Sequence, residues 1–124
     1  MESIGEIMKN ICIAFFVIFI SVLCGQSGAN EKDYVFGENS IVIDVRTEKE
    51  YKEGHLSNST NIPHGEIKEK IEEHVKGKEE EIVLYCRTGR RSGIVEKILN
   101  EIGYVNVINA GAYEKLRKKE AMLP

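Results

Sequence analysis

The sequence predicts a single α/β domain with a central, mostly parallel sheet and helices on both faces. Short β-branched and apolar runs alternate along the chain with segments whose apolar residues recur every three or four positions, which is typical of strands alternating with helices. Parallel neighbours need crossover connections, and helices supply them. The 124 residues, 42% of them hydrophobic, are enough for one domain with its own core.

The first half of the domain is expected to hold two strands and two helices. Residues 40–46, SIVIDVR, are a β-branched run that predicts a buried strand. The capping-box pattern TEKE, which begins at Thr47, predicts a short helix that ends at Gly54. A short extended piece precedes Pro63, and the apolar residues of 65–77 recur at four-residue steps, which predicts an amphipathic helix that ends in glycine.

The second half begins with an apolar strand expected at residues 81–85. From Ser92 onward, apolar residues recur at helical spacing until Gly103, which is placed to end a helix. Residues 104–108 predict another strand, and residues 112–120 predict a last helix.

The N-terminus is expected to be an export signal. Residues 11–24, ICIAFFVIFISVLC, follow Lys9 and are almost entirely apolar. A membrane span needs about 20 such residues, so this stretch is short for a span and suits the core of a signal peptide. We expect residues 1–29 to be a signal peptide cleaved after Ala29 or an N-terminal membrane anchor, with lipidation of Cys24 as a further possibility. Each of these three possibilities places residues 30–124 in the periplasm or on the outer side of the membrane.

Cysteine usage and charge narrow the function. Cys12 and Cys24 lie in the leader, so its cleavage would leave Cys86 as a lone thiol in an oxidising compartment and therefore as a candidate reactive thiol. The net charge of −3 lacks the basic excess of nucleic-acid-binding proteins.

Cys86 ends an apolar strand and opens the segment CRTGRRSG. A tight loop between a strand and a helix can aim several backbone N–H groups at one point, and the helix dipole adds partial positive charge there. Nearby cations, here Arg87, Arg90 and Arg91, depress the pKa of a thiol. We therefore expect Cys86 to be a nucleophile beside an anion-binding loop. The alternative is a small buried hydrophobic residue that closes a core strand.

Other polar residues are expected mainly to support the site. Asp44 and Arg46 end another strand and can line the same crevice, because ligands bind at the carboxyl ends of parallel strands. We expect them to hold a loop by hydrogen bonds and a salt bridge rather than to act in catalysis. His55 is expected to cap a helix. His64 and His74 have no neighbouring residues in a metal-site pattern, so neither a metal nor another cofactor is predicted.

Three segments, in this order, resemble the rhodanese-like sulfurtransferase family. They are IDVRTEKEYKEGHLSNSTNIP, the strand and loop VLYCRTGRRS, and GYVNVINAGAYEKL. The chain most resembles the small exported single-domain members of the phage-shock type, including their leader peptides. The resemblance implies a rhodanese-like domain at residues 30–124. It also implies that the Cys86 thiolate takes sulfane sulfur from thiosulfate or a similar donor, holds it as a persulfide and passes it to cyanide, a thiol or a protein thiol.

The resemblance also implies a substrate-binding loop, with Ser92, Asp44 and Arg46 in supporting positions. Its residues are Arg87, Thr88, Gly89, Arg90 and Arg91, whose backbone N–H groups would face the sulfur. Arg87 and Arg91 are the best candidates for holding sulfonate oxygens or the loop itself, because guanidinium is a planar fork for oxyanions. For Arg90, the alternative to a role in the loop is that its side chain simply faces solvent. Gly89 either adopts a backbone geometry that other residues resist or allows the substrate to come close. The alternative is that it is an incidental loop glycine.

Loop length separates the competing functions. Related phosphatases and arsenate reductases place five residues between the nucleophilic cysteine and the closing arginine, whereas four separate Cys86 from Arg91. A smaller loop fits one sulfur atom better than a phosphate. A second alternative to a sulfurtransferase is a binding module. It would use the loop without turnover, or would carry a persulfide delivered by a partner.

Overall fold

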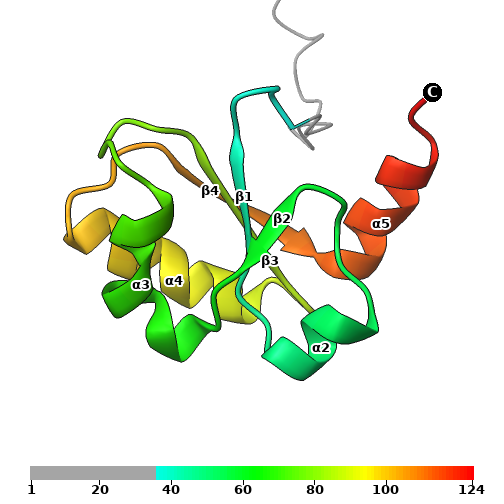
Figure 1. Cartoon of the computed structure of the whole chain (residues 1–124), viewed down its shortest axis with the longest axis horizontal. Coiled ribbons are helices and arrows are strands. Elements are labelled where there is room, and N and C mark those ends of the chain that lie inside the picture. Colours follow the sequence, from blue (N-terminus) through cyan, green and yellow to red (C-terminus); the bar gives the residue numbers. More distant parts are fainter. Residues whose placement is uncertain (1–35) are drawn as a thin grey trace, which may run out of the picture. The chain divides into compact units, whose positions relative to one another are not determined.

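Four parallel strands form the sheet of the domain. The computed structural model describes residues 36–124, so the expected leader at residues 1–29 lies outside the described residues. The strands are β1 (Ile41–Asp44), β2 (Ser59–Asn61), β3 (Ile82–Cys86) and β4 (Val107–Ala112). They pair in the order β2-β1-β3-β4, and every pair is parallel (Figure 1). Their carboxyl ends therefore lie along one edge of the sheet.

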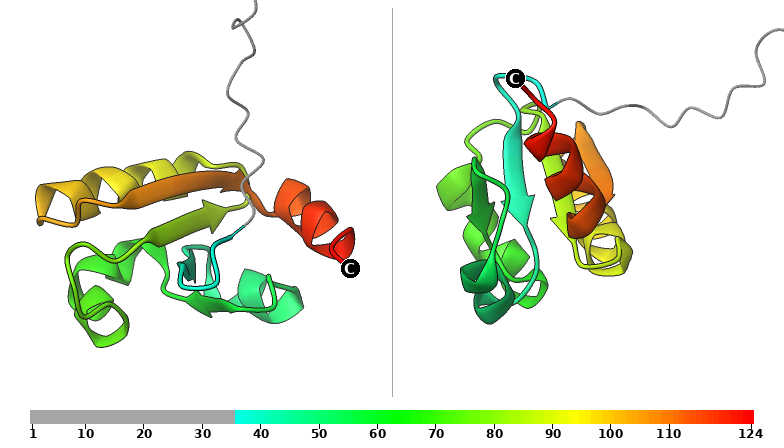
Figure 2. Two further views of the ribbon diagram at one scale, coloured as in Figure 1. Left: turned by 90° about the horizontal axis from the view of Figure 1, so that it is seen from above. Right: turned by 90° about the vertical axis from the view of Figure 1, so that its right-hand side faces the viewer.

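Helices connect the strands and cover both faces of the sheet. They are α2 (Glu48–Glu53), the 3-10 helix η1 (His64–Glu66), α3 (Ile67–His74), α4 (Arg90–Glu101) and α5 (Tyr113–Ala121). The buried hydrophobic residues of α3 and α4 belong to one cluster on one face, and that of α5 belongs to another cluster on the opposite face (Figure 2). The predicted α/β fold is confirmed.

Two hydrophobic clusters hold the helices against the sheet. The larger consists of Ile43, Val45, Ile62, Ile67, Ile71, Val75, Ile82, Leu84, Cys86, Val95, Leu99 and Tyr104. The smaller consists of Val42, Leu56, Val83, Tyr85 and Leu116. Because β3 contributes alternate residues to both clusters, all of its side chains are buried. Cys86 thus ends a strand that cannot shift without disturbing both cores.

The predicted capping box forms at the start of α2. The Thr47 hydroxyl accepts the backbone N–H of Glu50 at 3.2 Å, and the Glu50 carboxylate accepts the backbone N–H of Thr47 at 3.0 Å. Gly54 ends the helix, as predicted. Because α2 buries none of its residues, polar contacts must set its position beside the sheet.

The amphipathic helix predicted for residues 65–77 is shorter than expected. Its first residues belong to η1, and α3 ends at His74, where Val75 adopts an extended conformation. The Glu80 carboxylate accepts the two backbone N–H groups that follow Val75, at 3.1 and 3.3 Å. These N–H groups are therefore unavailable to continue the helix, and the chain turns toward β3.

Strand β4 begins later than the strand predicted at residues 104–108. Tyr104 is buried in the core, whereas Val105 is 73% exposed and donates its N–H to the Lys78 carbonyl at 3.0 Å. The pairing with β3 continues through residues 109–112 instead, around an irregularity in the register. The prediction was wrong because Asn, Ala and Gly are weak strand formers, and pairing with the neighbouring strand overrides this preference.

None of the helices in residues 36–124 is both long enough and apolar enough to cross a membrane.

Candidate active site

The thiol of Cys86 is enclosed by the loop that follows β3. The residue is buried. Its Sγ accepts the backbone N–H of Gly89 at 3.0 Å, and the hydroxyl of Ser92 lies 3.5 Å away as a second donor. The predicted succession of strand, loop and helix therefore brings donors from the loop and from α4 to one sulfur atom.

The pKa of the Cys86 thiol is lower than its ordinary value. Burial raises this pKa, but hydrogen bonds from the Ser92 side chain and from the backbone N–H groups of Ser92, Thr88 and Gly89 lower it more. The thiolate, which is the nucleophilic form, is thereby favoured. The sequence argument named both the loop N–H groups and the three arginines, and in the structure the hydrogen-bond donors make the main lowering contribution.

Gly89 gives the loop its shape. It precedes α4 with φ of 93°, in the left-handed region. A Cβ at this position would lie 3.2 Å from the Cα of Gly111 in β4. Because the torsion angle and the close approach of Gly111 both disfavour a side chain, the glycine is required here rather than incidental.

Arg91 joins the loop to α2. Its guanidinium donates to both carboxylate oxygens of Glu50, at 2.8 and 3.0 Å. This hydrogen bond is the main cause that lowers the pKa of Glu50 to about 2. Of the two roles predicted for Arg91, the contacts favour holding the loop over holding substrate. Glu50 was predicted only as part of a capping box, and its contact with Arg91 was missed.

The other two loop arginines lie on different sides of the loop. Arg87 is exposed and lines a hollow formed with α2 and the start of α5. Arg90 is also exposed but lines a separate shallow hollow with residues of its own helix, such as Lys97 and Asn100. The structure thus separates the three arginines that are adjacent in sequence, and only Arg87 faces the hollow beside the thiol loop.

Asp44 and Arg46 form a buried ion pair at the carboxyl end of β1. The Arg46 guanidinium donates to Asp44 Oδ2 at 2.7 Å and to the Gly54 carbonyl at 2.7 Å. Desolvation lowers the pKa of Arg46, but the hydrogen bond and charge of Asp44 leave it raised overall. The guanidinium also lies over the Tyr113 ring, 4.2 Å from its centroid. The expected salt bridge is present, and it joins β1 to the end of α2.

Asn109 is a site residue that sequence reasoning missed. Its Nδ2 donates to the Gly89 carbonyl at 3.0 Å, and its Oδ1 accepts the Gly111 N–H at 3.0 Å. Asn109 Oδ1 also lies 2.7 Å from the Ser92 hydroxyl, whose single proton is shared between this oxygen and the Cys86 sulfur. It therefore fastens the Cys86 loop to β4. Asn109 lies in the third resembling segment, where an asparagine directly after the strand predicted at residues 104–108 was the available signal.

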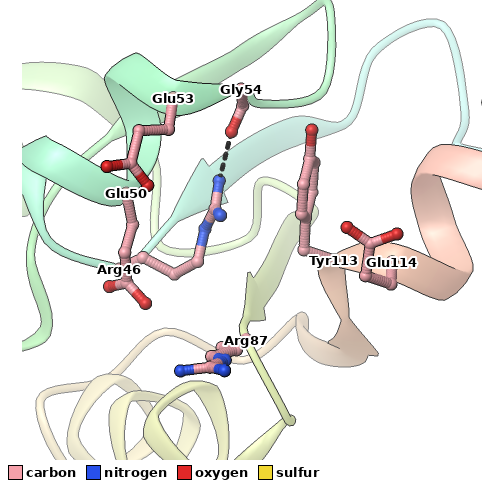
Figure 3. A pocket seen from close by; sticks show the side chains of 7 residues that line it. All are labelled: Arg46, Glu50, Glu53, Gly54, Arg87, Tyr113 and Glu114. Carbon is pink, nitrogen blue, oxygen red and sulfur yellow. Dashed lines mark hydrogen bonds between the residues drawn. The ribbon is translucent and has the colours of Figure 1, made fainter.

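A hollow that we call the edge hollow lies beside the Cys86 loop (Figure 3). Arg87 borders it on the loop side, α2 and Gly54 on a second side, and the start of α5 on a third. Its lining residues are Arg46, Glu50, Glu53, Gly54, Arg87, Tyr113 and Glu114. The edge hollow gives molecules an approach to the loop from the carboxyl edge of the sheet.

His55 contacts the helix that it follows rather than the Cys86 loop. His55 Nδ1 is 2.8 Å from the Tyr51 carbonyl, and its ring stacks on that of Tyr51. This is the capping contact expected of it. Within residues 36–124, no three His, Cys, Asp or Glu side chains form a group that could hold a metal ion.

The comparisons with known proteins identify the family. The family model described as rhodanese-like domain matches residues 29–119. The chain therefore belongs to the rhodanese-like family, and the resemblance stated from its three segments is confirmed.

Individual relatives agree with this assignment. The thiosulfate sulfurtransferase PspE of Escherichia coli is 40% identical over 74 residues, which cover 60% of this chain and 71% of that protein. A solved rhodanese with anions from E. coli is also 40% identical, with a TM-score of 0.59 over 60% of this chain and 88% of that one. A human single-domain sulfurtransferase, 24% identical with a TM-score of 0.57 over 65% of this chain and 83% of that one, supports the fold alone.

We predict that Ser92→Ala raises the pKa of Cys86, because it removes the hydroxyl donor beside the sulfur. The rate of alkylation by iodoacetamide, measured against pH, follows the thiolate fraction. Its midpoint should lie below that of the urea-unfolded protein and should move upward in the variant. Ser57→Ala, at an exposed serine, is the control. Superimposable profiles for Ser92→Ala and the parent protein would show that the hydroxyl does not stabilise the thiolate.

We predict that Glu50→Gln destabilises the domain at pH 7 by about 1 kcal/mol, because it breaks the partly exposed ion pair with Arg91. The folded-state pKa of Glu50, about 2, lies below its ordinary value of 4.5. Its stabilisation is therefore complete above pH 4.5 and is lost as the pH falls toward 2.

Urea unfolding between pH 7 and pH 2.5 measures this loss. The difference between Glu50→Gln and the parent should shrink in acid, whereas Glu69→Gln, at an exposed position on α3, should show little difference throughout. A Glu50→Gln effect that does not change with pH would contradict an ionic origin.

Proposed function

We propose that this rhodanese-family protein is a thiosulfate sulfurtransferase that carries sulfur on Cys86. The observation that carries the proposal is the Cys86 sulfur, which has a lowered pKa and lies among the hydrogen-bond donors of a tight loop. The relative named thiosulfate sulfurtransferase, at 40% identity, supports the choice of donor. The rhodanese solved with anions supports an anionic substrate.

In the first step, the Cys86 thiolate attacks the outer sulfur of thiosulfate. A bond forms between Sγ and this sulfur as the sulfur–sulfur bond of thiosulfate breaks, and sulfite leaves with the electron pair. The product is a Cys86 persulfide. The N–H groups that stabilise the thiolate can also stabilise negative charge on the persulfide, because they are held in place before the reaction.

Arg87 is the loop side chain placed to favour the anionic donor. It is exposed at the edge hollow, and among the described residues it has neither a hydrogen bond nor an ion pair. Its charge is therefore available to the sulfonate oxygens of thiosulfate. Arg91, by contrast, is engaged by Glu50, so we assign it the role of holding the loop.

We predict that incubation with thiosulfate adds the mass of one sulfur atom to the protein and releases an equal amount of sulfite. Intact-protein mass spectrometry and a sulfite assay measure both products, and cyanide should then remove the sulfur as thiocyanate. Cys86→Ser should neither gain sulfur nor release sulfite. Equal sulfur uptake by Cys86→Ser would reject the mechanism. A Cys86 persulfide that forms by sulfur transfer from another persulfide, with no sulfite release from thiosulfate, would favour a carrier role.

We also propose that residues 1–29 export the domain. The support is the apolar stretch at residues 11–24, followed by small and polar residues. Fusion of residues 1–35 to an alkaline phosphatase that lacks its own leader should give active phosphatase outside the bacterial cytoplasm. The same phosphatase fused to residues 30–35 alone should stay inactive. Inactive phosphatase in both fusions would contradict export, and mass spectrometry of the native protein distinguishes cleavage after Ala29 from lipidation at Cys24.

A further inference from the structure

The edge hollow contains more charge than the transfer of sulfur from thiosulfate requires. Five of its seven lining residues carry a charged side chain, two of them positive and three negative. A small anionic donor needs a cation, which Arg87 supplies, and gains nothing from carboxylates. We therefore asked which of these charges are neutralised by neighbouring residues and which are left for a ligand.

Two of the charges are satisfied by buried or partly buried partners outside the hollow. Arg46 is paired with Asp44 at 2.7 Å, and both side chains are almost fully buried. Glu50 is paired with Arg91 at 2.8 Å, and these side chains are only 26% and 20% exposed. Neither pair is free to exchange its partner for a ligand without leaving a poorly solvated charge behind.

The remaining charges are available to a ligand. Within residues 36–124, Glu53 and Arg87 form neither a hydrogen bond nor an ion pair with another residue, although both line the hollow. Glu114 pairs with Arg117 at 3.0 Å, but both side chains are more than half exposed, so water screens that pair. The hollow therefore offers one free cation on the loop side and carboxylates from α2 and α5 on the other sides (Figure 3).

We infer that the edge hollow binds the sulfur acceptor and selects a small thiol that carries an ammonium group. The inference rests on the proposed function, because it needs a persulfide on Cys86. The ammonium lies near Glu53, with Glu114 adding to the negative potential, while the thiol end points toward the loop. A carboxylate in place of the ammonium is repelled by Glu53 and Glu114, because the Arg87 cation lies on the loop side, toward the thiol end of the acceptor.

The transfer step is balanced without a further reactant. The acceptor thiolate attacks the outer sulfur of the Cys86 persulfide and forms a new sulfur–sulfur bond. The bond between that sulfur and Cys86 Sγ breaks, and Cys86 leaves as the thiolate that its hydrogen-bond donors stabilise. The product is the persulfide of the acceptor, and the enzyme is ready for another donor.

The test compares three acceptors of similar size: cysteamine, which carries an ammonium group, the neutral 2-mercaptoethanol, and 3-mercaptopropionate, which carries a carboxylate. Persulfide-loaded protein is mixed with each thiol, and loss of the sulfur is followed by mass spectrometry to give a second-order rate constant. The quantity compared is the ratio of the cysteamine to the mercaptopropionate rate constant. Differences in intrinsic thiol reactivity cancel when this ratio is compared among protein variants.

Glu53→Gln should lower this ratio by roughly three- to tenfold, as expected for loss of one charge within about 5 Å of the ligand in a solvated site. Glu53→Lys should lower it further, and salt of about 0.5 M should reduce both effects. The rate with 2-mercaptoethanol should not change. Glu101→Gln is the matched control, because it removes the same charge from the far end of α4.

The outcomes separate this inference from the proposed function. Sulfur transfer at the same ratio in the parent protein, Glu53→Gln and Glu53→Lys would overturn the charge selection and leave the sulfurtransferase activity standing. Equal loss of the ratio in Glu101→Gln would assign the effect to net charge and would also overturn it. Failure of every variant, the parent included, to acquire sulfur from thiosulfate would instead reject the proposed function.

Discussion

The active-site loop depends on the backbone of one residue, Gly89. The N–H of this residue donates to the Cys86 sulfur at 3.0 Å, and its carbonyl accepts the N–H of Gly93 at 3.1 Å, which is the first turn of α4. The strand that presents the thiol and the helix that follows it are thus joined within three residues. The left-handed conformation of Gly89 makes this junction possible, because it turns the N–H toward the sulfur while the carbonyl points along the helix.

Side chains from three other elements keep this junction in place. Glu50 of α2 holds Arg91, Asn109 of β4 holds the Gly89 carbonyl, and the Asp44–Arg46 pair joins β1 to the residue that ends α2. A buried ion pair such as Asp44–Arg46 contributes little net stability, because desolvating two charges offsets their attraction. Its effect here is geometric, since it sets the position of α2, which buries none of its own side chains.

The parts predicted well from the sequence were those with local signals. The order of strands and helices, the capping box at Thr47 and the placement of Cys86 between a strand and a tight loop each depend on residues within one short segment. Contacts between distant segments could not be predicted in this way: Glu50 and Arg91 are 41 residues apart, and Asn109 and Gly89 are 20 residues apart. The start of β4 was misplaced for the same reason, because the neighbouring strand and not the local preference decides which residues pair.

The contact between Gly89 and Gly111 also limits what chemistry the loop can acquire. The backbones of the loop and of β4 approach so closely that even one added carbon would lie 3.2 Å from the Gly111 Cα. The loop therefore cannot widen toward β4 without disturbing the pairing of Cys86 with Ala112. Two residues without side chains thus fix one wall of the space around the Cys86 sulfur.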